Sequence, residues 1–308
     1  MGFIMSKTIA KPFLKWAGGK TQLLDEFAKR IPAELKDGGI NSFVEPFIGG
    51  GAVFFHLNSI FSFDECHLFD NNEELVLAYN VVRKDVDELI ECLAEMAAEY
   101  IPLDDKGRSE YYYSVRDNFN SEKEGINFRR YGKNWIPRAA QLIFLNKTCF
   151  NGLFRVNSRG GFNVPFGQYK NPKIVNPDLL RADSEALSST KIHRGDFASS
   201  LRHVTDDSFV YFDPPYRPLS LTASFTAYSK NGFDDCEQKR LARYYKRCHA
   251  RGAKLMLSNS DPKNIDPDDN FFDDLYSDFK IERVSAKRMI NADAEKRGAV
   301  DEILVMNY

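Results

Sequence analysis

Short apolar runs alternate with amphipathic stretches along both ends of this chain. Apolar runs bounded by Gly, Pro, Asn or Asp are typical of buried strands, and apolar residues at three- and four-residue spacing predict helices. We expect strands at residues 42–45, 66–70, 190–193, 209–212, 254–258, 279–284 and 302–307. We expect helices at residues 52–60, 72–83 and 234–251, an extended segment at 9–14, and a helical stretch that ends at Arg30.

The middle of the chain interrupts this alternation. Helical spacing recurs at residues 86–100, 110–119 and 137–148, and residues 154–164 have the pattern of a hairpin that turns at 158–161. Because strands and helices alternate on either side, the simplest architecture is a Rossmann-like α/β domain with a doubly wound mixed sheet. We expect this domain to comprise residues 1–75 and 179–308, and an inserted, mainly helical domain with the hairpin to comprise 76–178.

Cysteine and histidine usage argues against a disulfide framework and against a metal site. The five cysteines are scattered without a C-x-x-C pair, and the five histidines show no helical metal-binding spacing. No apolar run has the length of a transmembrane helix. These features predict a cytoplasmic protein that needs neither a membrane nor a metal.

Charge is unevenly distributed, although the formal net charge is only −2. Residues 127–177 contain no Asp or Glu, whereas the chain average predicts about seven. A basic module in an acidic chain fits a polyanionic partner better than the net charge suggests, and a solvated basic face without a partner is the alternative. The basic residues are Arg129, Arg130, Lys133, Arg138, Lys147, Arg155, Arg159, Lys170 and Lys173.

A glycine-rich turn, Glu45 to Gly51, joins the first predicted strand to the helix that follows. Glycines let the backbone approach a ligand closely, and the start of a helix offers free N–H groups. Asp70 ends the second strand, where a carboxylate binds ribose hydroxyls in dinucleotide-type folds. The pattern predicts a nucleoside cofactor. The GxGxxG spacing is absent, which disfavours NAD, and Leu14 stands where a P-loop needs its first glycine.

Asp213, Pro214, Pro215 and Tyr216 follow the apolar strand at 209–212 and form a second candidate site. The prolines end the strand, so a carboxylate is held at its carboxyl end beside an aromatic ring. The Asp213 carboxylate and the Pro214 carbonyl can accept the hydrogens of an exocyclic amine whose ring stacks on Tyr216. Two acceptors make the nitrogen lone pair more available, so the site stabilises the transition state. With a nucleoside cofactor, this predicts metal-independent methyl transfer from S-adenosylmethionine to an amine.

These motifs together resemble the Dam-like DNA adenine-N6 methyltransferases of the alpha group, the D12 class. The resemblance covers nearly the whole chain and follows the family order of cofactor turn, recognition insert and DPPY. It rests on residues 12–20 (PFLKWAGGK), 43–52 (FVEPFIGGGA), 150–157 (FNGLFRVN), 162–167 (FNVPFG) and 213–216 (DPPY).

The resemblance implies a role for each matching residue of the catalytic domain. Trp16 would line the cofactor with Lys20 close by, and Asp70 would hold the ribose. Asp196 and Phe197 would hold the cofactor's adenine through its amine and ring face. The methionine part would lie on the turn formed by Glu45, Pro46, Phe47, Gly49 and Gly51, and the target base would bind at Asp213, Pro214, Pro215 and Tyr216.

The resemblance also makes the basic insert a target-recognition module for double-stranded DNA. Arg155 would contact a guanine edge, which is worth roughly 1–3 kcal/mol of discrimination, and the adenine would be flipped out of the duplex. The implied target is GATC, methylated on adenine N6. Further contacts would come from Phe150, Asn151, Leu153, Asn157 and Pro165, and phosphates would be bound by Lys147, Arg159, Lys170 and the other basic residues of the segment. Some members of the family are associated with restriction systems, so a cognate restriction endonuclease is a candidate partner. We expect the protein to be a monomer.

Two other classes of function fit part of this pattern. One is a methyltransferase that acts on another amine, such as cytosine N4, an RNA base or a protein glutamine. The other is a DNA-binding protein with a vestigial cofactor fold, against which the intact Asp70, Asp196 and DPPY motif speak.

Overall fold

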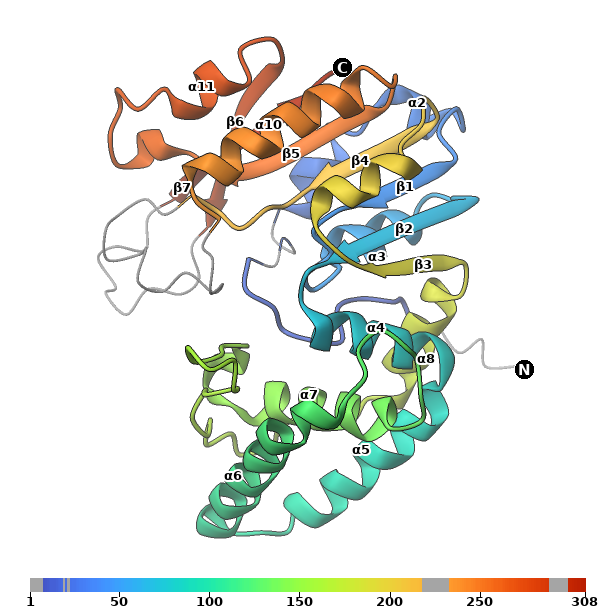
Figure 1. Ribbon diagram of the computed structural model, residues 1–308, viewed down its shortest axis with the longest axis vertical. Coiled ribbons are helices and arrows are strands. Elements are labelled where there is room, and N and C mark those ends of the chain that lie inside the picture. Colours follow the sequence, from blue (N-terminus) through green and yellow to red (C-terminus); the bar gives the residue numbers. More distant parts are fainter. Residues whose placement is uncertain (1–7, 19, 21–22, 218–232, 288–298) are drawn as a thin grey trace, which may run out of the picture. The chain divides into compact units, whose positions relative to one another are not determined.

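Seven strands form one mixed sheet in the order β3-β2-β1-β4-β5-β7-β6 (Figure 1). The computed structural model describes residues 8–18, 20, 23–217, 233–287 and 299–308. All seven predicted strands are confirmed, with small shifts at their ends. They are β1 (Ser42–Glu45), β2 (Glu65–Asp70), β3 (Thr190–Arg194), β4 (Ser208–Phe212), β5 (Lys254–Ser260), β6 (Lys280–Lys287) and β7 (Ala299–Met306).

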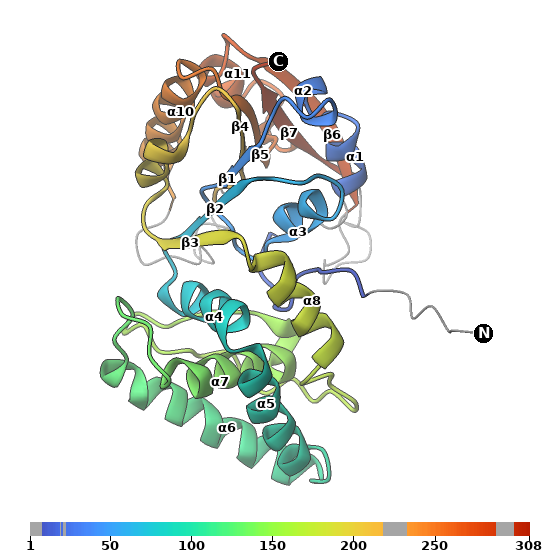
Figure 2. The ribbon, with the colours of Figure 1, turned by 90° about the vertical axis from the view of Figure 1, so that its right-hand side faces the viewer.

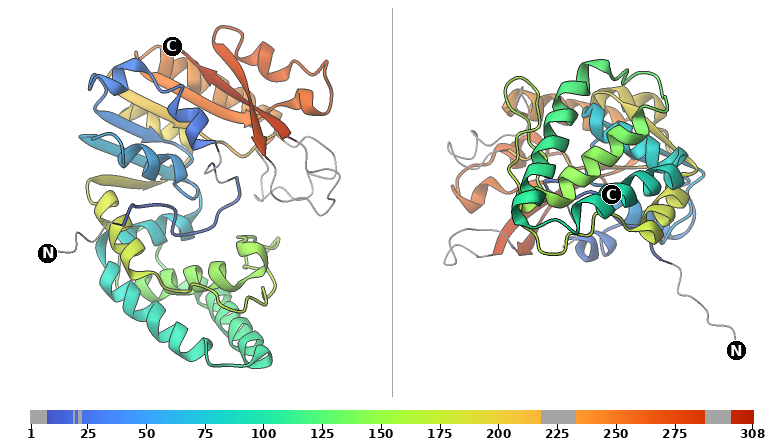
Figure 3. Two further views of the ribbon diagram at one scale, coloured as in Figure 1. Left: turned by 180° about the vertical axis from the view of Figure 1, so that it is seen from behind. Right: turned by 90° about the horizontal axis from the view of Figure 1, so that it is seen from below.

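The strand order reverses between β1 and β4. Strand β1 pairs in parallel with β2 on one side and with β4 on the other, and β4 pairs in parallel with β5. Strand β7 runs antiparallel to both of its neighbours, β5 and β6, and the β6–β7 pair forms the long orange and red arrows of Figure 3. In open α/β sheets, ligands bind outside the carboxyl ends of the strands at such a reversal. Glu45 ends β1, and Asp213 directly follows β4.

The chain divides into two units, each built from separate segments. Unit 1 contains residues 1–19, 49–60 and 70–194, and unit 2 contains residues 20–48, 61–69 and 195–308. The predicted boundaries of the inserted domain, 76 and 178, stay a prediction. The helices are α1 (Leu24–Ala28), α2 (Ala33–Lys36), α3 (Ala52–Asn58), α4 (Glu73–Lys84), α5 (Val86–Tyr100), α6 (Asp105–Ser121), α7 (Trp135–Thr148), α8 (Pro177–Leu187), α10 (Asp235–His249) and α11 (Phe271–Leu275).

In unit 2, helices cover both faces of the sheet. Helix α10 lies on one face, and α1 and α2 lie on the other (Figure 2). Helix α10 begins where the side chain of Asp234 accepts a hydrogen bond from the backbone N–H of Glu237, an ordinary N-terminal cap. Its buried side chains, among them Leu241 and Tyr245, join a core with Phe212 of β4 and residues of β5 and β7.

In unit 1, helix α7 is the central element. Buried side chains lie all round it, as expected for a helix packed on every side, and it contacts α4, α5 and α6. Figure 3 shows these helices from below. The Arg138 guanidinium of α7 pairs with the Glu74 carboxylate of α4, donates to the Phe119 carbonyl of α6 and lies 3.5 Å from the centroid of the Phe119 ring. One buried cation therefore links three helices.

The helices were predicted less completely than the strands. The helical stretch before Arg30 is limited to α1 in the described residues, and residues 9–14 belong to no helix or strand. Helix α8 was not predicted, although Asn176 caps its N-terminus and Pro177 occupies its first position, which is a recognisable start signal. Among the described residues, no helix is long and apolar enough to cross a membrane.

Candidate active site

The glycine-rich turn after β1 is held in a conformation that needs glycine. Gly49 and Gly51 have positive φ angles of 47° and 74°. A β-carbon on Gly51 would lie 2.5 Å from the Tyr79 hydroxyl, which itself donates to the Gly49 carbonyl at 3.1 Å. A side chain at Gly51 would therefore collide with Tyr79, so the turn needs glycine at this position.

The Asp70 carboxylate is fixed beside this turn. It accepts backbone hydrogen bonds from Gly49 at 3.1 Å and from Asn72 at 2.8 Å, so the ends of β1 and β2 are tied together. Burial raises the pKa of Asp70, and the backbone N–H donors oppose that rise. A carboxylate in this position, next to a turn without side chains, fits a ribose bound by its hydroxyls.

Trp16 packs against the same turn. A β-carbon on Gly49 would lie 3.2 Å from Cδ1 of Trp16, and the Trp16 ring stacks on Phe154 with centroids 5.0 Å apart. The preceding residue is anchored by Asn146, whose side chain accepts from the Lys15 N–H and donates to the Lys15 carbonyl, both at 2.9 Å. Asn146 was not predicted as a site residue. Gly19 of the same motif lies outside the described residues.

Asp213 and Tyr216 both contact the same cation. The Lys20 ammonium is 3.0 Å from Oδ1 of Asp213 and 4.2 Å from the centroid of the Tyr216 ring. The Ser258 hydroxyl donates to Asp213 at 3.2 Å, and the Tyr216 hydroxyl donates to Glu302. Burial raises the pKa of Asp213, while Lys20 and Ser258 oppose the rise. Lys20 was predicted beside the cofactor, which stays a prediction, and its ammonium contacts two residues of the DPPY motif.

The remainder of the DPPY turn is anchored by hydrogen bonds that the sequence did not reveal. The Pro215 carbonyl accepts from the Gln238 side chain at 3.2 Å, and Pro214 is buried. The next residue, Arg217, forms ion pairs with Asp235 at 2.8 Å and with Asp269 at 2.6 Å. These contacts fix both ends of the turn, so Asp213 and Tyr216 are preorganised.

Asp196 and Phe197 follow β3 and begin a 3₁₀ helix (Phe197–His203). The Asp196 carboxylate caps this helix by accepting from the Ala198 N–H at 2.9 Å. The Phe197 ring packs against Phe47, with centroids 5.4 Å apart. Arg240 of α10 pairs with the carboxylate, which lowers the pKa of Asp196.

The predicted recognition hairpin is a loop that folds back on itself with one antiparallel bridge, Val156 to Phe162, and no regular strands. Asn157 closes its turn: its side chain accepts from the N–H groups of Arg159 and Gly161. Arg155 is exposed, and its Nε donates to the Asn163 side chain at 2.8 Å.

Comparison with known proteins decides the family. Residues 16–290 match the model of the D12 class N6 adenine-specific DNA methyltransferases. The chain belongs to this family. The resemblance found in the motifs is confirmed, as is the Rossmann-like mixed fold. The chain is an adenine-specific DNA methyltransferase, and DNA is its substrate.

Curated relatives match this methyltransferase over nearly its whole length. It is 50% identical over 299 residues to the type II methyltransferase M.MjaIII of Methanocaldococcus jannaschii, across 97% of this chain and 99% of that protein. It is 39% identical over 305 residues to the type II methyltransferase M1.LlaDCHI of Lactococcus lactis, across 98% and 97%. It is 35% identical over 296 residues to the DNA adenine methylase of Escherichia coli, across 96% and 95%.

The structure corrects part of the charge argument for this methyltransferase. Arg138 was counted among the phosphate-binding residues, but it is 2% exposed and paired with Glu74. Lys133 was counted too, and its ammonium pairs with Asp85 at 2.8 Å and with Glu88 at 3.1 Å. The acids that neutralise Arg138 and Lys133 lie outside residues 127–177. The composition of this segment therefore overstated its positive surface charge.

The remaining predicted DNA contacts of the methyltransferase differ in exposure. Phe150 is 53% exposed, and its N–H donates to the carbonyl of exposed Pro165 at 2.8 Å. Asn151 has a positive φ of 57°, which is uncommon outside glycine. Lys147 is half-buried; burial lowers its pKa, and the Asp183 carboxylate opposes this shift. Leu153 is half-buried, whereas Asn151, Arg155, Asn157, Arg159 and Lys170 are exposed.

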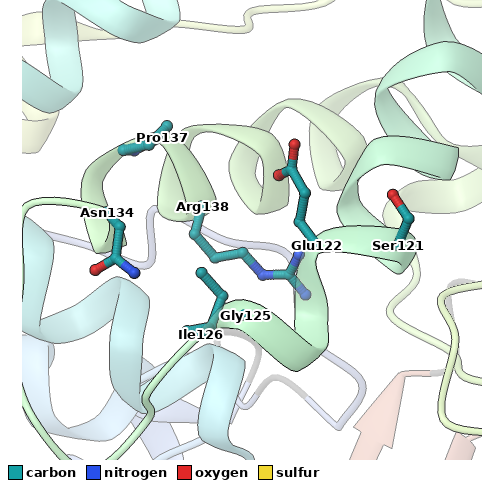
Figure 4. A pocket seen from close by; sticks show the side chains of 7 residues that line it. All are labelled: Ser121, Glu122, Gly125, Ile126, Asn134, Pro137 and Arg138. Atoms are coloured by element: carbon teal, nitrogen blue, oxygen red, sulfur yellow. The ribbon is translucent and has the colours of Figure 1, made fainter.

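One described pocket of the methyltransferase lies elsewhere in unit 1. It has a volume of about 420 Å³, and Arg138 is the one residue of its lining that was predicted to contact DNA (Figure 4). The Arg138 guanidinium in its lining donates to the Glu74 carboxylate and to the Phe119 carbonyl. Its charge is therefore largely neutralised within the protein. The residues that line it are Ser121, Glu122, Gly125, Ile126, Asn134, Pro137 and Arg138.

Proposed function

We propose that this methyltransferase transfers a methyl group from S-adenosylmethionine to adenine N6 within GATC in duplex DNA, after the adenine is flipped out of the helix. The observation that carries this proposal is the contact of one ammonium group, that of Lys20, with both the Asp213 carboxylate and the Tyr216 ring. The carboxylate and the ring face therefore share one position for a polar N–H group. An adenine stacked on Tyr216 can direct its N6 hydrogens to Asp213 in the same way.

The residues around the glycine turn support S-adenosylmethionine as the cofactor, which supplies an electrophilic methyl group. Asp70 would accept the ribose hydroxyls, and the bare backbone of Gly49 to Gly51 would lie against the methionine part. Asp196 would accept a hydrogen bond from the amine of the cofactor's adenine, and Phe197 would stack on the adenine ring. Asp213 would accept hydrogen bonds from the target amine, so that the nitrogen lone pair faces the methyl group.

Target choice would lie in the hairpin. Asn163 accepts from the Nε of the exposed Arg155 through its side chain and from one terminal nitrogen through its carbonyl, and the other guanidinium N–H groups would face a guanine edge. The relatives named DNA adenine methylase support adenine as the target, and those named type II methyltransferase support a cognate restriction endonuclease as a partner. We propose that the methyltransferase acts as a monomer.

The test is transfer of a tritiated methyl group to duplexes that contain GATC, compared with duplexes in which its adenine is replaced by 2-aminopurine or its order is scrambled. We expect label only on GATC duplexes and only in N6-methyladenine after hydrolysis. Label in cytosine, or equal label on scrambled DNA, would contradict the proposal.

A further inference from the structure

Arg240 of helix α10 engages both groups that are assigned to the cofactor's adenine. Its two terminal nitrogens donate to the two Asp196 carboxylate oxygens, at 2.8 and 2.5 Å. Its guanidinium carbon lies 4.0 Å from the centroid of the Phe197 ring. A planar cation with N–H groups at its edge thus makes the two contacts that a planar adenine with an exocyclic amine would make.

Three hydrogen bonds therefore engage the Asp196 carboxylate, and both of its oxygens take part. One oxygen accepts from Arg240 and from the Ala198 N–H, and the other accepts from Arg240. An adenine amine that approaches the carboxylate therefore meets oxygens that already accept hydrogen bonds from a charged donor. Such bonds are stronger than the bond that a neutral amine would form.

Arg240 also has a second acceptor within reach. Glu237, three residues earlier on α10, accepts from Nε of Arg240 at 3.0 Å and from a terminal nitrogen at 2.6 Å. The Arg240 side chain is 34% exposed, so it can rotate toward solvent without losing its charge partner.

We propose that Arg240 competes with the cofactor's adenine for Asp196 and Phe197, and that cofactor binding leaves the guanidinium paired with Glu237 alone. This inference rests on the proposed function, in which Asp196 and Phe197 bind that adenine. Arg240 is then a residue that sets cofactor affinity without taking part in the reaction. Because a partly exposed ion pair is screened by salt, the competition weakens as ionic strength rises.

Calorimetric titration with S-adenosylhomocysteine tests the proposal. We expect Arg240→Ala to bind about three- to tenfold more tightly than the parent, because an exposed ion pair and a cation–π contact no longer compete. The affinity of Arg240→Lys for S-adenosylhomocysteine should lie between those of the parent and Arg240→Ala, since an ammonium cannot contact both Asp196 oxygens in parallel. Lys246→Ala is the matched control: Lys246 also lies on α10, its exposed ion pair with Asp278 measures 2.6 Å, and its loss should leave the affinity for S-adenosylhomocysteine unchanged. Equal or weaker binding by a folded Arg240→Ala would overturn the proposal.

A salt titration of the parent protein keeps the proposal testable if Arg240→Ala does not fold. With uncharged adenosine as the probe, affinity should rise as salt is added, and it should stay constant if Arg240 does not compete. Asp196→Ala, made alone and with Arg240→Ala, separates the two claims. If Asp196→Ala leaves affinity unchanged in both backgrounds, the adenine assignment of the proposed function is wrong. If it weakens binding while Arg240→Ala brings no gain, only the competition is wrong.

Discussion

The Lys20 ammonium lies 3.0 Å from the Asp213 carboxylate, and the two side chains are only 5% and 19% exposed. A buried carboxylate tends to be protonated, and an adjacent cation opposes that tendency. For Asp213, burial raises the pKa and Lys20 lowers it. Lys20 therefore favours the ionised form of Asp213, which is the form that can accept hydrogen bonds from the target amine.

Removal of this cation should move the acid limb of the pH profile. Asp213 must be ionised to act, so the single-turnover rate falls as pH drops through its pKa. In Lys20→Met that pKa rises, so the rate should begin to fall at a higher pH than in the parent. Lys20→Arg should restore the parent profile. A lower rate with an unchanged acid limb would show that Lys20 acts in another way.

Asp213→Ala should separate binding from chemistry. The carboxylate contacts the target amine and not the duplex, so DNA affinity measured by fluorescence anisotropy should be largely retained. The single-turnover rate should fall by about 10²- to 10³-fold, the range for loss of one group that stabilises the transition state. Equal losses of affinity and rate would contradict the assignment.

Arg155→Ala should relax discrimination at one guanine by roughly 1–3 kcal/mol, measured as relative kcat/KM over a panel of altered sites. Asn163→Ala removes the side-chain acceptor of the Arg155 Nε but keeps the carbonyl that accepts from a terminal nitrogen, so it should have a smaller effect in the same direction. Arg159→Ala is the comparison, because loss of a phosphate contact should weaken binding uniformly across the panel. An unchanged order of preference in Arg155→Ala would refute its role.

Glu74 and Arg138 should dominate the stability of unit 1. Their pair is buried, so Arg138→Met should lower the free energy of unfolding by about 3–5 kcal/mol because Glu74 is left as an unpaired buried charge. Arg181→Ala is the matched control: its 3.0 Å pair with Asp87 is exposed and should contribute about 1 kcal/mol or less. Urea unfolding measures both. Similar losses in the two variants would show that burial of the pair does not matter.

The strands were predictable because their side chains are apolar over a short run and are bounded by turn residues. Strand β4, buried at all five positions, and the Asp213 that follows it are the clearest case. The partners of polar side chains were not predictable. Arg138 and Glu74 are 64 residues apart, and Asn146 and Lys15 are 131 apart, so no local pattern joins them.

The same reason explains what was missed around Asp196. The DPPY motif and the glycine turn are local, and a single sequence reveals them. Arg240 is 44 residues from Asp196 and lies on the polar side of an amphipathic helix, where a charged residue carries no signal of its own. Only the fold brings the Arg240 side chain to the carboxylate. In the same way, it stacks the rings of His67 and His203, whose centroids are 3.8 Å apart.

The most direct test of the central claim is digestion of plasmid DNA after incubation with this methyltransferase and S-adenosylmethionine. Two endonucleases are needed, one that cuts GATC only when its adenine is methylated and one that cuts it only when unmethylated. We predict that the DNA becomes sensitive to the first and resistant to the second, and that Asp213→Ala produces neither change. Unaltered digestion by both enzymes, under conditions in which methyl label enters the DNA, would contradict GATC as the target.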